Sequence, residues 1–113
     1  MKKVEAIIRP EKFQALKDQL YAMGIGGLTV TEAAGTGKQK GKKGIFRGTE
    51  FEIQVVPKLK IELVVNDDQV DPMVKAIIDI CDTDTVGDGK IFIIPVEESI
   101  RIRTGERGEA AIL

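Results

Sequence analysis

The sequence contains no histidine and only one cysteine, Cys81. A single cysteine cannot form a disulfide within the chain. Without histidine, one chain also cannot build a histidine/cysteine zinc site or use histidine to activate a nucleophile. The acidic residues form no evident catalytic pair. These absences predict that the protein is not an enzyme.

Long apolar runs are also missing, because no stretch approaches the ~20 apolar residues that span a bilayer. A strand-like run follows Met1 directly, without a signal-peptide pattern. The net charge is -1 over 113 residues, so any attraction for anions must be local. We expect one domain, residues 1–113, located in the cytoplasm.

Two halves of the chain repeat the same order of elements. In the first half, strands are expected at 3–9 and 28–34. The helix between them carries an apolar stripe of Phe13, Leu16, Leu20 and Met23. In the second half, strands are expected at 52–65 and 91–96, the first of them interrupted by Pro57, which should lie at a bulge, a strand start or a sheet edge. The second helix carries a stripe of Val70, Val74, Ile77, Ile78 and Cys81.

This repetition predicts the fold class. Two right-handed strand–helix–strand units interleave into a four-stranded antiparallel sheet with both helices on one face. The prediction is an α+β protein, a ferredoxin-like double βαβ sandwich with a long loop between its halves. The face without helices would carry Ile7, Val64 and either Ile91 or Phe92, which are too apolar to remain in water. We therefore expect a homo-oligomer.

The loop between the halves is basic and rich in glycine. From Thr36 to Thr49 it contains five basic residues and no acidic one. Such a segment has little apolar surface to bury, so we expect a mobile loop over about 36–54. Composition alone fits a binding loop and a solvated insertion equally well.

Two other patterns suit an anion. Gly87-Asp88-Gly89-Lys90 precedes a strand, where glycine backbone can approach a phosphate and lysine supplies charge; alone, the pattern is more typical of an ordinary Asp-Gly turn. Arg101 and Arg103 alternate along a possible short strand at 99–103, which would place both guanidinium groups on one face. Pairing with Glu97, Glu98 or Glu106 is an equal alternative.

Several segments together resemble the PII signal-transduction proteins, the nitrogen regulatory protein family. They are MKKVEAIIRPEKF, the GTGKQKG run, PKLKIELVV, TDTVGDGKIFIIPVEE and IRIRTGERGEAAI. The resemblance covers essentially the whole chain. It implies a homotrimer with the bare sheet faces inward, clefts between subunits that bind ATP or ADP, and a C-terminal segment of about 99–113.

The resemblance also implies the ligand sites. Nucleotide would be bound by Thr29, Gly35, Gly37, Lys38, Glu62, Val64, Gly87, Asp88, Gly89, Lys90, Arg101 and Arg103, with both arginines from the neighbouring subunit. In many members 2-oxoglutarate binds beside Mg-ATP. The matching residues here are Gln39, which would share in Mg²⁺ coordination, Lys40, Gly41 and Lys58.

The loop would dock a target, such as an ammonium transporter or a metabolic enzyme, so membrane contact would be indirect. The loop residues expected to contact the target are Lys42, Lys43, Phe46, Arg47, Thr49 and Phe51. Phenylalanines replace the tyrosines common at 46 and 51, so nucleotidylation of a loop tyrosine is not expected. Thr36 and Lys38 also depart from the family pattern, which commonly has an aromatic residue and arginine there.

The leading hypothesis is a sensor of ATP, ADP and 2-oxoglutarate that regulates its target through the loop. The alternative within the family is an energy sensor that binds only ATP and ADP. An RNA-binding module of the same fold would need aromatic residues on two central strands, and only Phe92 lies in a predicted strand. We therefore expect no nucleic-acid partner.

Overall fold

The computed structural model describes residues 1–40 and 51–112, and for 37–40 and 51–54 it describes the backbone only. The strands are β1 (Lys2–Ile8), β2 (Thr29–Lys40), β3 (Phe51–Val65) and β4 (Gly89–Pro95). The helices are α1 (Phe13–Ala22) and α2 (Asp67–Cys81), with short 3-10 turns at Pro10–Lys12 and Gly108–Ala111.

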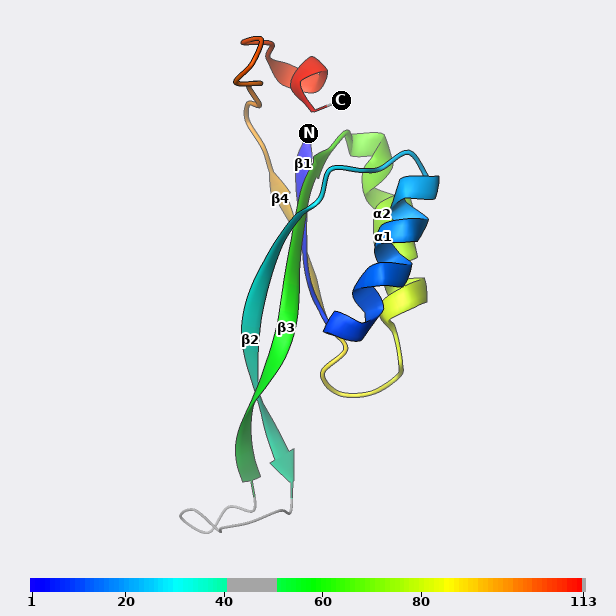
Figure 1. Cartoon of the computed structure of the whole chain (residues 1–113), viewed down its shortest axis with the longest axis vertical. Helices are drawn as coiled ribbons and strands as arrows, with labels where there is room; N and C mark the ends of the chain where they lie inside the picture. Colours follow the sequence, from blue (N-terminus) through cyan, green and yellow to red (C-terminus); the bar gives the residue numbers. More distant parts are fainter. Residues whose placement is uncertain (41–50, 113) are drawn as a thin grey trace.

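The four strands form one antiparallel sheet in the order β2-β3-β1-β4. Both helices lie against the same face of the sheet (Figure 1). This arrangement confirms the predicted α+β, ferredoxin-like fold. The core lies between the sheet and the helices, where Val4, Ala6 and Ile61 have no exposed surface.

Helix α1 forms as its apolar spacing predicts. Leu16 and Leu20 are fully buried, and Phe13 and Met23 pack partly against the core. The helix ends before Gly24, whose φ of +78° is a left-handed conformation that glycine adopts without a steric penalty. Pro10 opens the preceding turn, a position that does not require its missing N–H.

Helix α2 differs from the prediction in one position of its stripe. The helix buries Met73, Ala76, Ile77 and Cys81, whereas Val70 and Val74 are half-buried. Ile78 was expected in the stripe, but its side chain is 51% exposed. One helical residue turns the side chain by about 100°, so Ile78 leaves the face that Ile77 directs into the core.

The sheet face without helices is more charged than predicted. Ile7, Val64 and Phe92 share this face as expected, whereas Ile91 lies on the helix side and packs against the core. Four charged side chains also occupy the bare face and form a network of ion pairs: Lys3, Glu5, Lys60 and Glu62. The bare face therefore combines the expected apolar residues with a charged network that the sequence analysis did not predict.

The β2–β3 hairpin is longer than the sequence suggested. Pairing continues outward to Lys40 opposite Phe51, so much of the predicted loop at 36–54 is strand, and residues 41–50 lie outside the described part. Figure 1 shows this hairpin projecting beyond the helix-covered sheet. Pro57 pairs with Ala34 of β2, but β1 pairs with β3 only over Leu59–Val65. Pro57 thus occupies a stretch of β3 with one neighbour, as a sheet-edge position requires.

The possible strand at 99–103 is not formed. Ile100 makes one isolated bridge to Arg107. A turn follows it, in which Gly105 N–H donates to the Arg101 carbonyl and Arg101 N–H donates to the Glu106 carbonyl. The chain folds back on itself here, so Arg101 and Arg103 do not alternate along a sheet. No helix among the described residues combines the length and apolar character that a membrane crossing needs.

Candidate functional site

The turn before β4 is organised by the Asp88 side chain. Oδ2 accepts hydrogen bonds from the backbone N–H of Thr83 (2.7 Å) and of Thr85 (3.3 Å). Oδ1 accepts from the hydroxyls of the same two threonines. Hydrogen bonding from the Thr83 hydroxyl, followed by its N–H, lowers the pKa of Asp88 well below the usual range for a carboxyl. Asp88 is therefore a carboxylate that holds the 83–88 turn together.

Arg9 also holds this turn, and the sequence analysis did not identify it. Its Nε donates to Asp88 Oδ1 at 3.2 Å, and its Nη2 donates to Thr85 Oγ1 (3.1 Å) and the Val86 carbonyl (3.0 Å). In the sequence Arg9 only ends a strand before Pro10. Strand β1 lies beside β4, with Ile8 opposite Gly89. Arg9, which follows Ile8, therefore reaches the turn that precedes β4. Only the strand order reveals this contact.

Lys58 connects the same turn to the base of the β2–β3 hairpin. Its side chain is almost buried, with 9% of the residue exposed, and its ammonium donates to the Gly87 carbonyl. A Cβ on Gly35 would lie 3.2 Å from Lys58 Cγ, so Gly35 packs closely over the lysine stem. The structure thus brings together Gly35, Lys58 and Gly87, which the sequence analysis had assigned to two adjacent ligand sites.

The glycines of the turn have conformations that other residues rarely adopt. Gly87 has a φ of +97° and Gly89 a φ of +122°. A Cβ on Gly89 would lie only 1.8 Å from the Ile7 carbonyl oxygen of the neighbouring strand. Glycine is therefore obligatory at position 89, and it leaves the backbone there free of side-chain atoms.

A second group of predicted residues lies on the bare sheet face. Thr29 pairs with Glu62 in the register, and Val64 lies farther along the same face of β3. Glu62 forms ion pairs with Lys3 (3.1 Å) and Lys60 (3.7 Å). The hydrogen bond from Lys3 is the main cause of a lowered pKa at Glu62.

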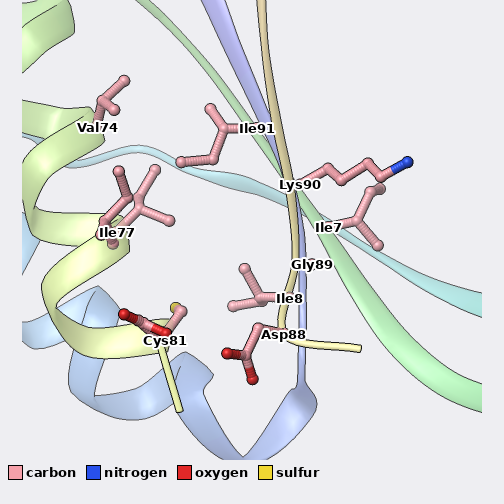
Figure 2. Close-up of a pocket in the computed structure, with 11 residues that line it drawn as sticks. Ile7, Ile8, Val74, Ile77, Cys81, Asp88, Gly89, Lys90 and Ile91 are labelled. Atoms are coloured by element: carbon pink, nitrogen blue, oxygen red, sulfur yellow. The ribbon is translucent and has the colours of Figure 1, made fainter. Parts of the chain in front are cut away.

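Lys90 belongs to this bare face as well. It pairs with Ile7 at the start of β4. Figure 2 shows its side chain directed away from the cleft between α2 and β4. That cleft, of about 410 Å³, is walled by apolar side chains including Ile8, Val74, Ile77 and Ile91, with Cys81 at one end. Of the predicted ligand residues, Asp88, Gly89 and Lys90 line this cleft, but the Lys90 side chain points to the bare face of the sheet.

Arg101 and Arg103 lie beyond the other end of β4. Arg101 donates to Glu106 Oε1 at 2.9 Å and to the Ala110 carbonyl at 3.0 Å, and Arg103 is exposed. Gly89 is the first residue of β4 and both arginines follow its last residue, Pro95, so the length of the strand, roughly 20 Å at the usual rise, separates them. One chain does not bring the arginines to the glycine turn.

The remaining predicted residues lie at the outer hairpin or beyond the described part. The backbones of Gly37, Lys38, Gln39 and Lys40 pair with residues 54 to 51 in the β2–β3 ladder, which includes Phe51. Outside the described residues are Gly41, Lys42, Lys43, Phe46, Arg47 and Thr49. Within the described part of the chain, no three Asp, Glu or Cys side chains cluster as metal ligands.

Comparisons with known proteins agree on one family. The family model described as "Nitrogen regulatory protein P-II" matches residues 1–106. Curated proteins of that name from Cereibacter sphaeroides and Nostoc punctiforme are each 53% identical over 112 residues, covering 99% of this chain and all of the relative.

Solved structures agree with these relatives. Bacillus subtilis GlnK superposes with a TM-score of 0.81 at 39% identity, covering 97% of this chain and 96% of that one. Arabidopsis thaliana PII bound to citrate superposes with a TM-score of 0.78 at 41% identity, covering 98% and 88%.

Proposed function

This chain belongs to the nitrogen regulatory protein P-II family, and on that premise we propose that it is a non-enzymatic sensor of ATP and ADP. Its family membership makes it a signal-transduction regulator. The finer proposal is that nucleotide binds at the glycine turn, that 2-oxoglutarate binds beside Mg-ATP, and that both ligands set the state of the loop that contacts a cytoplasmic target.

The contact of Lys58 with Gly87 is the observation that carries this proposal. A Cβ on Gly87 would lie 3.3 Å from Arg9 Nη2 and 3.7 Å from Lys58 Nζ, so backbone without side-chain atoms lies beside two cationic groups, which suits the close approach of a phosphate. Lys58 adds a positive charge directly beside the turn. Lys58 and Gly35 belong to the base of the β2–β3 hairpin, which leads to the loop. A ligand at the turn would therefore contact Lys58, a residue of the hairpin itself. Binding and loop conformation can therefore be coupled.

The separation of the predicted nucleotide residues supports a homotrimer. Arg101 and Arg103 lie at one end of β4 and the glycine turn at the other. A neighbouring subunit would supply the arginines to complete the site, because two guanidinium groups suit a polyphosphate. The exposed Phe92 (48%) and Ile94 (38%) on the bare face supply apolar surface for the assembly.

The 2-oxoglutarate site would adjoin the nucleotide. Lys58 would bind a carboxylate of the acid, with Lys40 and Gly41 of the hairpin nearby, while Gln39 and the ATP phosphates would hold Mg²⁺. The positive charges offset the repulsion between a dicarboxylate and ATP. The Arabidopsis relative is described as bound to citrate, which is also a small polycarboxylic acid. The target of the loop would be an ammonium transporter or a metabolic enzyme.

Calorimetry on the full chain tests these proposals. We expect heat on addition of ADP, Mg-ATP, and 2-oxoglutarate after Mg-ATP, but none when 2-oxoglutarate follows ADP.

Arg103→Ala should weaken ATP binding by at most a few kcal/mol, the range for one charge-assisted contact. Arg107→Ala is the matched control, since Arg107 pairs with Glu98 (3.6 Å) in the same segment. Absence of ATP and ADP binding would refute the proposal; absence of 2-oxoglutarate binding alone would favour an ATP/ADP energy sensor.

A further inference from the structure

We propose that Asp88, Thr83 and Arg9 form a positioning unit for the nucleotide site, and that the Asp88 carboxylate is not itself a phosphate ligand. This inference rests on the proposed nucleotide function and deepens it. The family resemblance had grouped Asp88 with Gly87, Gly89 and Lys90 as residues that cradle the phosphates. The contacts of its side chain give it a different role.

Both carboxylate oxygens of Asp88 are already engaged by the protein. One accepts the backbone N–H groups of Thr83 and Thr85, and the other accepts their hydroxyls and Arg9 Nε. Every one of these donors except Arg9 belongs to the turn itself. A carboxylate facing a polyphosphate would repel it, whereas a carboxylate directed into the turn holds the backbone in one conformation.

Arg9 ties this turn to the central part of the sheet. One guanidinium reaches Asp88, the Thr85 hydroxyl and the Val86 carbonyl at 3.0–3.2 Å. Because Arg9 follows β1, which pairs with both β3 and β4, the turn is anchored to the sheet's interior strand as well as to β4. The planar fork of arginine makes these contacts together, and the single ammonium of lysine cannot reproduce them.

The turn needs such support because its backbone is unusual. Asp84 has a φ of +56°, and Gly87 and Gly89 also have positive φ values. A positive φ is sparsely populated for Asp84, and Gly87 and Gly89 have many other conformations open to them in a free chain, so an unsupported turn would sample others. Nucleotide would then have to order the turn as it binds, which weakens affinity without removing any group that contacts the phosphates.

Substitutions at Thr83 provide a matched test in the full-length protein. Thr83→Val keeps the shape of the side chain and removes the hydroxyl, whereas Thr83→Ser keeps the hydroxyl. Thr83→Val loses the contacts of the hydroxyl with Asp88 Oδ1 and with Thr85 Oγ1. We expect Mg-ATP to bind about three- to tenfold more weakly to this variant, and Thr83→Ser to restore wild-type affinity. Calorimetry measures both. Equal affinity of the two variants would overturn the inference.

Asp88→Asn tests the role of the carboxylate, because the two possible roles predict opposite changes in the affinity for Mg-ATP. A positioning carboxylate predicts weaker Mg-ATP binding in Asp88→Asn, because the pairing with Arg9 and one acceptor are lost. A carboxylate that faces the phosphates predicts tighter binding, because a repulsion is removed. Hydrogen exchange without nucleotide supplies a second readout: the Thr83 and Thr85 amides should be protected in the wild type and exchange faster in Asp88→Asn.

These outcomes separate the inference from the function on which it rests. A wild-type chain that binds neither ATP nor ADP would overturn the proposed function, and with it this role for the turn. Wild-type binding combined with tighter binding by Asp88→Asn, or with unchanged amide exchange, would overturn the positioning role alone.

Discussion

At the scale of single residues, Gly89 has the strictest steric requirement among the glycines whose surroundings the structure describes. Its φ is +122°, and a Cβ would lie 1.8 Å from the Ile7 carbonyl oxygen. We expect Gly89→Ala to lower the free energy of unfolding by more than about 3 kcal/mol, because either β1 or β4 must move. Urea denaturation measures the change.

Gly24→Ala is the matched control for that substitution. Gly24 also has a positive φ, +78°, but a Cβ there would meet no atom within 4 Å. Its substitution should cost only about 1–2 kcal/mol, the penalty for a left-handed alanine. Equal losses from both substitutions would show that backbone conformation alone, and not the contact with Ile7, governs position 89.

Asp88 should make stability depend on pH in the acid range. Its hydrogen bonds lower the pKa of the folded protein's carboxyl below the unfolded value of about 3.9. Between the two pKa values the unfolded state binds more protons, so stability rises with pH there. The contribution is complete above about pH 4 and is lost as the pH falls through the folded pKa. Thermal unfolding from pH 7 to 2 should therefore show a shallower acid decline in Asp88→Asn than in the wild type, and parallel curves would contradict this assignment.

At the scale of elements, two adjacent residues of α2 differ sharply in burial. Ile77 is 2% exposed and Ile78 is 51% exposed. We expect Ile77→Ala to reduce the free energy of unfolding by about 2–4 kcal/mol, since it removes buried methyl groups and leaves a cavity. Ile78→Ala, the adjacent control, should cost less than about 1 kcal/mol. Chemical denaturation of both variants measures this difference, and comparable losses would mean that Ile78 is buried in solution.

The β2–β3 hairpin is the other element whose extent matters for function. Its ladder runs from Thr29 opposite Glu62 to Lys40 opposite Phe51. Near its base, Lys58 contacts the glycine turn and Gly35 packs against the stem of Lys58. A paired stem therefore lies between the proposed ligand site and the segment at 41–50, so a change at Lys58 acts first on this stem.

At the scale of the whole molecule, the bare sheet face offers a test of the proposed trimer. Phe92 is 48% exposed on this face, beside the charged network of Lys3, Glu5, Lys60 and Glu62. If the faces pack together, Phe92→Glu adds a desolvated charge at every interface. We expect light scattering to give the mass of three chains for the wild type and a smaller mass for Phe92→Glu.

Tyr21→Glu is the control for this experiment. Tyr21 is 79% exposed on α1, in the layer on the opposite side of the sheet. The same added charge there should leave the assembly intact. A monomeric wild type would contradict the trimer, and dissociation of both variants would show that the effect is not specific to the bare face.

The sequence by itself determined the order of elements, the fold class and the family. Apolar residues at helical spacing, such as Leu16 and Leu20, and Val/Ile-rich runs specify elements because periodicity is a local property of the chain. The GDGK turn and the GTGKQKG run are contiguous, so they carry the family resemblance that implies the candidate site. Local patterns did not determine how wide the buried face of α2 is, and Ile78 was wrongly assigned to that face.

Tertiary structure alone decided how the site is assembled. Arg9 and Asp88 are 79 residues apart, and Lys58 and Gly87 are 29 apart. These pairs meet because the sheet order places β1 between β3 and β4. Likewise, the turn at Arg101 and the long stem of the β2–β3 hairpin depend on hydrogen bonds between backbone groups of different segments. Hydrogen bonds between distant segments leave no periodic signal in the sequence, because each depends on how the strands pair.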